Sequence, residues 1–184
     1  NAIISPATGL MIYQTDNSPG YYYNSGSSAS PDWILVGTGS GWGLTGNAGT
    51  SASTHFIGTT DNIPLAFRLN NQLSGKIDQL QYNISFGYQA MGSNTSGVSS
   101  VALGHQAHYS NKANTRSIAI GYQSLYYADD RTSGRPTYNI AIGCEALKGS
   151  MTASSNTGRY NTAIGEQVLS DNTTGDGNIG VSYL

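Results

Sequence analysis

Aliphatic and very small residues alternate in a nine-residue pattern that recurs through the second half of the chain. Residues 117–125 read small polar, β-branched, Ala, aliphatic, Gly, variable, Gln, small and large aliphatic. Side chains of a β-strand point alternately to its two faces, so the first positions predict a short strand with unlike faces. Further copies occupy 83–91, 100–108, 139–147 and 161–169, and a shorter one starts at 178. Such recurrence indicates a repeat protein with one strand per repeat.

The two faces of the repeated strand differ in side-chain size. We expect the large residues to be the structural core of the repeats: Ile84, Phe86, Val101, Leu103, Ile118, Ile120, Ile140, Ile142, Ile164, Ile179 and Val181. The small residues of the motif permit close approach of another backbone: Gly87, Ala102, Gly104, Ala119, Gly121, Ala141, Gly143, Ala163 and Gly165. Either the large residues lie inside each coil of the chain and the small face meets neighbouring chains, or the arrangement is the reverse.

The spacing of the repeats places their loops. The motif glycines stand at positions 87, 104, 121, 143 and 165, so a shorter interval occurs twice and a longer interval then occurs twice. The extra residues always follow the motif, which indicates a constant strand and a variable loop outside it. We therefore expect the insertions at 128–136 and 150–159 to lie on one side of a stack. Coils this small enclose a thin core, and oligomerisation is a common way to stabilise a thin core.

The seventh position of the motif carries an amide in four of five copies: Gln89, Gln106, Gln123 and Gln167. Amides stacked in register can donate hydrogen bonds along the stack, as in the Asn and Gln ladders of cross-β structures. We expect such a ladder here. A column that merely faces solvent is the alternative.

The first 82 residues contain no repeat, and we divide the chain at 1–37, 38–82 and 83–184. Strands at 9–14, 21–23 and 33–36, with turn residues at 16–20, predict a small three-stranded β module. The stretch 37–49 is rich in glycine but has neither a G-x-G-x-x-G nor a P-loop spacing, so we interpret it as a connector. Alternation at 63–69 predicts a half-buried strand.

Composition agrees with an all-β chain rich in turns. Gly, Ser, Thr and Asn make up 81 of 184 residues, and only 10% of residues are charged. The net charge of −2 provides no basic stripe for nucleic acid, and no apolar run is long enough to insert into a membrane. The chain stops within a repeat, so we expect the remainder of a longer chain to be one of its partners.

Few residues suggest site chemistry. His105 and His108 have a spacing seen in some metal sites, but no Cys, Asp or Glu accompanies them at zinc-like spacing, so we expect neither a metal nor a cofactor. If three copies of the chain associate, a His near their common axis could still meet its two copies around an ion. The inserted loops carry the candidate receptor-facing residues, which are Asp129, Asp130, Arg131, Arg135 and Arg159.

The repeated Asn/Ser-Ile-Ala-Ile-Gly core resembles the head repeats of trimeric autotransporter adhesins, which also occur in phage-type and bacterial tail-fibre proteins. The upstream segments 9–33 and 41–69 resemble the leader modules of Bacteroidota-type tail-fibre-domain proteins. This resemblance implies an all-β homotrimeric fibre. Its parallel, β-roll-like β-solenoid of head repeats would follow a small intertwined β module.

The resemblance also implies a role in attachment. We expect a structural fibre or adhesin segment, not an enzyme, that binds a cell-surface glycan or protein receptor. Its place would be extracellular, on a virion tail, an injection-machine fibre or a bacterial cell surface. A fibre-borne glycan depolymerase and a sugar-binding lectin module are the alternatives. A depolymerase needs two carboxylates held about 5–9.5 Å apart in one cleft.

Overall fold

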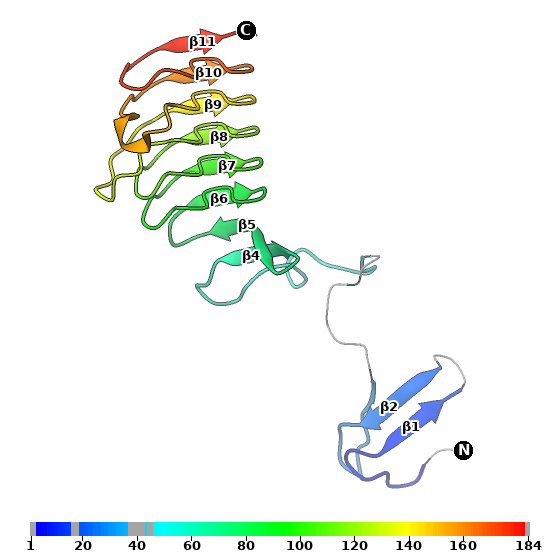
Figure 1. Ribbon diagram of the computed structural model, residues 1–184. Helices are drawn as coiled ribbons and strands as arrows, with labels where there is room; N and C mark the ends of the chain where they lie inside the picture. The colour runs from blue at the N-terminus through cyan, green and yellow to red at the C-terminus, as the bar shows by residue number, and fades with distance from the viewer. Residues whose placement is uncertain (1–2, 16–18, 37–42, 44–45, 183–184) are drawn as a thin grey trace. The chain divides into compact units, whose positions relative to one another are not determined.

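The computed structural model describes residues 3–15, 19–36, 43 and 46–182, and the chain divides into two compact units, Asn1–Ile57 and Gly58–Leu184. Figure 1 shows that both units are built of β-strands. Among the described residues the one helix is a short 3-10 turn, η1 at Ala153–Ser155. The all-β class expected from the sequence is therefore present.

The first unit is a three-stranded antiparallel meander. Its strands are β1 (Met11–Gln14), β2 (Gly20–Asn24) and β3 (Trp33–Leu35), paired in the order β1-β2-β3. The turn residues 16–18 and most of the Gly-rich stretch 37–49 lie outside the described residues. The strands expected from the sequence are found, each within a few residues of its expected bounds.

Asn24 organises the loop between β2 and β3. Its buried side chain donates to the carbonyls of Pro6 and Ala7 and accepts from the backbone N–H groups of Gly26 and Asp32. One amide therefore joins the segment before β1 to both ends of the Ser-rich loop. This use of all its donors and acceptors explains how so polar a side chain can be fully buried.

The second unit contains one eight-stranded sheet in the order β11-β10-β9-β8-β7-β6-β5-β4. The strands are β4 (Leu65–Leu69), β5 (Gln72–Asp78), β6 (Asn83–Phe86), β7 (Val101–Leu103), β8 (Ile118–Ile120), β9 (Ile140–Ile142), β10 (Thr162–Ile164) and β11 (Ile179–Val181). The six strands β6 to β11 are parallel and in register, so equivalent motif positions stack. Each repeat forms one turn of the chain, which we call a coil.

Within one chain the small residues lie inside the coils. Ala102, Ala119, Ala141 and Ala163 are fully buried in one hydrophobic cluster, together with residues from the end of the motif such as Leu125. The large residues expected as the repeat core face outward, and Ile118 is 37% exposed. Of the two arrangements that the alternation allows, the structure therefore has the one with the small residues inside the coil and the large residues outside. So short a coil leaves room between its walls for methyl groups but not for two layers of isoleucine.

A buried polar column runs beside the alanines at the first position of the motif. The side-chain oxygen of Asn83 accepts from the backbone N–H of Ser100, and Asn139 and Asn161 accept in the same way from the next coil. The side-chain amide of Asn83 donates to the carbonyl of Gly97 within its own coil. Each asparagine therefore joins two coils and closes one corner.

The backbone turns sharply four times in each full coil. Left-handed φ values recur before the motif and at its fifth, seventh and ninth positions, for instance at Arg116 (66°), Gly121 (127°), Gln123 (51°) and Leu125 (48°). Three of the four positions hold residues with a Cβ, so each coil stores backbone strain. Hydrogen bonds between coils offset it, such as those from the N–H groups of Gly121 and Gln123 to the preceding coil.

Strands β4 and β5 belong to the repeat sheet and do not form a separate module. β5 pairs antiparallel with β6, and β4 pairs antiparallel with β5. The expected 38–82 segment is therefore shared between the two units, which divide at residue 57. The strand expected to be half-buried at 63–69 is mostly exposed within one chain, on both of its faces.

We predict that Gly121→Ala strongly destabilises the second unit. A Cβ on Gly121 would overlap the carbonyl oxygen of Gly143 in the next coil, in addition to adopting the unfavourable φ of 127°. Gly177→Ala is the matched control, because Gly177 also has a left-handed φ of 71° but its Cβ would meet nothing within 4 Å. We expect a cost of about 1 kcal/mol for the control and at least twice that for Gly121→Ala in denaturant unfolding. Equal costs would contradict the close-contact role of the motif glycine.

Candidate interaction surfaces

The outward side of the repeat sheet is a continuous exposed apolar face, which we call the apolar stripe. Cross-strand pairing places Ile84 beside Ile77 and Phe86 beside Gly75, so the stripe runs on through the antiparallel strands. The rings of Phe67 and Phe86 are 5.0 Å apart across it. Its members are Leu65, Phe67, Ile77, Ile84, Phe86, Val101, Leu103, Ile118, Ile120, Ile140, Ile142, Ile164, Ile179 and Val181. So large a patch is typical of an interaction surface.

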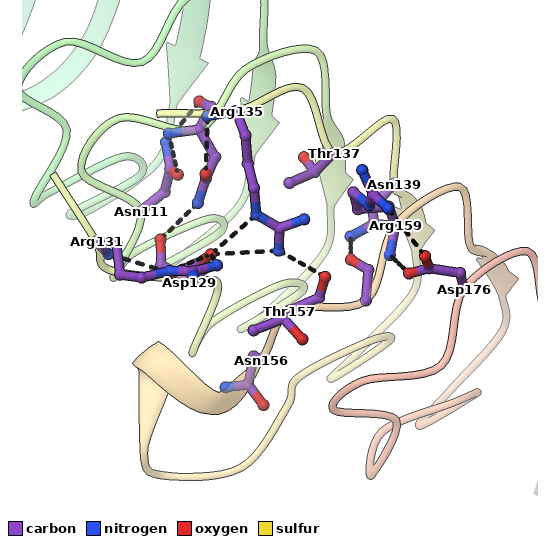
Figure 2. A network of polar contacts seen from close by, with 12 residues as sticks. Asn111, Asp129, Arg131, Arg135, Thr137, Asn139, Asn156, Thr157, Arg159 and Asp176 are labelled. Atoms are coloured by element: carbon purple, nitrogen blue, oxygen red, sulfur yellow. Dashed lines mark hydrogen bonds and ion pairs between the residues drawn. The ribbon is translucent and has the colours of Figure 1, made fainter. Parts of the chain in front are cut away.

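The two inserted loops meet on another side of the coils. The guanidinium of Arg135, in the first insertion, donates to the carbonyl of Thr157 in the second at 2.5 Å. The side chain of Asn156 donates to the carbonyl of Tyr127. Figure 2 shows how the polar side chains of both loops converge. The loops therefore lie side by side, as the repeat spacing predicts.

Asp129 is the centre of this polar network and is not a receptor-facing residue. Its carboxylate is 1% exposed and accepts from Arg131, through Nε at 2.8 Å and through Nη2, and from Arg135 at 3.3 Å. Unlike the exposed position expected of a receptor-facing residue, the carboxylate is enclosed by two guanidinium groups and the backbone N–H of Arg131. Burial raises the pKa of Asp129, but the hydrogen bonds from Arg131 and Arg135 outweigh burial and hold that pKa below its ordinary value.

The other candidate loop residues are more accessible. Asp130 forms a long ion pair with Lys112 at 3.6 Å, and both side chains are more than a third exposed. Arg131, Arg135 and Arg159 line an open groove of about 380 Å³ together with Thr157, Thr174 and Asp176. Arg159 holds Asp176 through a single guanidinium contact of 3.3 Å. The structure thus brings the three arginines together at one groove, with Asp129 beneath two of them.

Amide hydrogen bonds join the coils along the seventh motif position. Gln106 Nε2 donates to Gln89 Oε1 at 2.8 Å, and Gln123 Nε2 donates to Gln106 Oε1 at 2.9 Å. In the later coils Gln167 Nε2 donates to Glu145 Oε2 at 2.8 Å. Hydrogen bonds from Lys148 and from Gln167 lower the pKa of Glu145, so the carboxylate is charged where the ladder changes from amide to acid.

His105 and His108 occupy unlike environments. His105 is exposed and stacks between Tyr88 and Tyr122, with ring centroids 5.4 and 5.3 Å apart. His108 is fully buried, and its Nδ1 has no hydrogen-bond partner among the described residues. The two rings therefore do not form a pair of ligands. Within 3–15, 19–36, 43 and 46–182, no group of three or more His, Cys, Asp or Glu residues is placed to bind a metal.

Sequence reasoning missed the asparagines that hold the inserted loop. Asn114 donates to the carbonyl of Asp129 and accepts from the backbone N–H of Arg135, and it is anchored in turn by Asn111. Asn111 also donates to Asn94 in the preceding coil. The signal available in the sequence is the recurrence of Asn from 94 to 111, which is the shorter interval of the repeat.

Comparison with known proteins supports the resemblance to tail-fibre proteins at a coarse level. A family model described as a phage tail like trimerisation region matches residues 1–53. No curated protein and no solved structure matches the chain. The match supports a structural segment of a phage-tail-type fibre that associates with itself as a trimer. No helix in the described part of the chain is long and apolar enough to cross a membrane.

We predict that the second unit loses stability as the pH falls from 6.5 towards 4, because of His108. Burial lowers the pKa of His108 to about 4 from an ordinary value of 6.5. The unfolded chain therefore binds a proton in this window that the folded chain does not, and unfolding becomes easier by about 3 kcal/mol at most. Other copies of the motif carry leucine at this position, as Leu125, Leu147 and Leu169. In His108→Leu we expect the fall in thermal stability between pH 6.5 and about 5 to be much smaller, because the carboxylates titrate mainly below this range. An unchanged pH profile would contradict the assignment.

Proposed function

We propose that the chain is a structural segment of a tail-type fibre, in which three parallel copies associate and the repeats form a β-solenoid. The observation that carries this proposal is the apolar stripe, which extends over all eight strands of the repeat sheet. Its side chains are exposed or half-buried in the single chain, and the exposed ones include Ile77 at 43% and Ile164 at 38%. A chain with so thin an internal core needs a partner on this face.

The first unit supports the same proposal independently. Paired residues on one face of its meander are exposed, including Met11 and Tyr13 on β1, Tyr21 on β2 and Ile34 on β3. This face lies within the residues that match the trimerisation region. We propose that it packs against its two copies as an intertwined module, because three short strands bury little surface alone.

The fibre would serve attachment through the inserted loops. If the apolar stripe is turned towards the other copies, the loops at 128–136 and 150–159 stay accessible. Their groove offers three guanidinium groups, which suit carboxylate- or phosphate-bearing receptors. A glycan or protein receptor at the surface of a cell is the partner class proposed.

A binding role is favoured over a depolymerase by the placing of the carboxylates. Asp129 lines an inner cavity and Asp176 lines the outer groove, so the two acids do not share a cleft. Each is also paired with arginine, and hydrogen bonds lower the pKa of Asp176. A general acid for glycoside hydrolysis needs a raised pKa and a second carboxylate nearby.

We predict that Ile120→Asp breaks the trimer. The side chain lies in the middle of the apolar stripe, where an unpaired carboxylate would be desolvated by the other copies. Light scattering of the native chain should give three times the 19.3 kDa chain mass, and the variant should give a smaller assembly. Met151→Asp, at a residue that is 83% exposed in the second insertion, is the control and should remain a trimer. A native monomer, or a trimeric Ile120→Asp, would contradict the proposal.

We predict that Arg131→Ala weakens attachment without changing the assembly. Arg135 and the backbone N–H of residue 131 still hold Asp129 in this variant, so the loop remains folded. Binding to an array of anionic bacterial surface glycans should fall by about tenfold, which corresponds to about 1.4 kcal/mol. Lys112→Ala removes a similarly exposed cation outside the groove and should bind normally. Equal binding by all three proteins would exclude the groove as the receptor site.

A further inference from the structure

Two columns of exposed side chains border the apolar stripe. The leading column precedes each repeated motif and consists of Tyr82, Ser99, Arg116, Tyr138 and Tyr160. The trailing column is the sixth motif position and consists of Tyr88, His105, Tyr122, Cys144 and Glu166. All ten residues are exposed, whereas the first and third motif positions between them are almost all buried. Left-handed φ values at the leading column and at the motif glycine turn the chain away on both sides.

The width between the columns matches the side of a three-sheet assembly. Sheets packed face to face lie about 10 Å apart, so three sheets around an axis would each lie about 5 Å from it. The triangle that they form has a side of about 17 Å, which is about five residues of extended strand. The leading and trailing columns are six positions apart and therefore fall at the corners. At each corner the leading column of one copy faces the trailing column of the next.

The chemistry of the columns is complementary at the same coil. Glu166 has no ion pair within the described part of the chain, and Tyr160, which carries a hydroxyl donor, lies at the other end of its strand. Two coils earlier Arg116 makes no salt bridge in the described chain. Its guanidinium donates to the Tyr138 hydroxyl at 2.6 Å and lies over that ring, and Tyr122 stands at the far end of its strand.

We propose that, in the trimer, the leading column of each copy meets the trailing column of the neighbouring copy at the same coil level. This inference rests on the proposed trimer and specifies its register. It places Arg116 on the neighbour's Tyr122, Tyr138 beside the neighbour's Cys144, and the Tyr160 hydroxyl beside the neighbour's Glu166. The first is a cation–π contact and the last a charge-assisted hydrogen bond. The apolar stripe brings the copies together, and the columns set their height relative to one another.

The lone Cys144 makes the register measurable. Tyr138→Cys puts a second thiol in the leading column of the same coil, within reach of the neighbour's Cys144. Arg116→Cys and Tyr160→Cys put it one coil earlier or later, displaced by about 4.8 Å. Disulfides need Cα atoms no more than about 7 Å apart, so a displacement of one coil prevents or greatly slows the bond. Diamide supplies the oxidant, and non-reducing gels of the full chain report covalent trimers.

We expect Tyr138→Cys to form covalent trimers at least tenfold faster than Arg116→Cys, Tyr160→Cys or Met151→Cys. The bond should not form in Tyr138→Cys with Cys144→Ser. Faster linkage by either displaced variant, or equal linkage by all, would overturn the same-coil register. Ser99→Cys with His105→Cys, in a Cys144→Ser chain, tests a second coil and should link as well. If it does not while the protein is folded, the inference fails.

Light scattering separates this inference from the proposed function. A chain that is not trimeric overturns both. A trimeric chain in which the thiols of one coil do not link preferentially overturns the register alone and leaves the trimeric fibre in place.

Discussion

The narrowness of the coil determines the rest of this structure. The distance across the interior of one coil is small. Alanine methyl groups and asparagine amides fill it, so it cannot also contain the isoleucines of the same strand. These side chains are therefore turned outward, although they are the most apolar in the repeat. The hydrophobic effect ordinarily buries the largest apolar side chains inside a domain, but here they form the outer surface of the single chain. Burial of this surface against other copies would therefore both stabilise the chain and drive its association.

Inside the coil, polar groups carry much of the order. The asparagine column, the glutamine ladder and the Asn94 and Asn111 pair each repeat at the interval of the coil. Every one of these amides joins its coil to the next, so each contact also maintains the register of the strands. The left-handed turns fit the same scheme, because hydrogen bonds between coils stabilise backbone angles that a single coil would not maintain.

The inserted loops show how a repeat can vary without losing its stack. The first insertion is closed by Asp129, which two arginines and Asn114 surround, and the second insertion receives Arg135 through Thr157. The loops are thereby built onto the stack as an ordered polar layer. The two surfaces of each coil are built from different parts of the chain: the strands form the apolar stripe, and the loops form the groove with its three guanidinium groups.

Much of this protein is determined by the sequence alone, because a strict alternation that recurs at two regular intervals leaves little choice of element, direction or loop placement. Residues such as Ile118 and Ala119 identify the two faces of the strand, and Gln106 identifies the ladder. Alternation cannot say which face is inside, since both choices have the same period. That choice depends on the space between the walls of the coil, which exists only once residues from the end of the motif, such as Leu125, close it. The burial of Asp129 is likewise tertiary, because its two arginines and the asparagine beneath it converge only when the loop folds onto the stack.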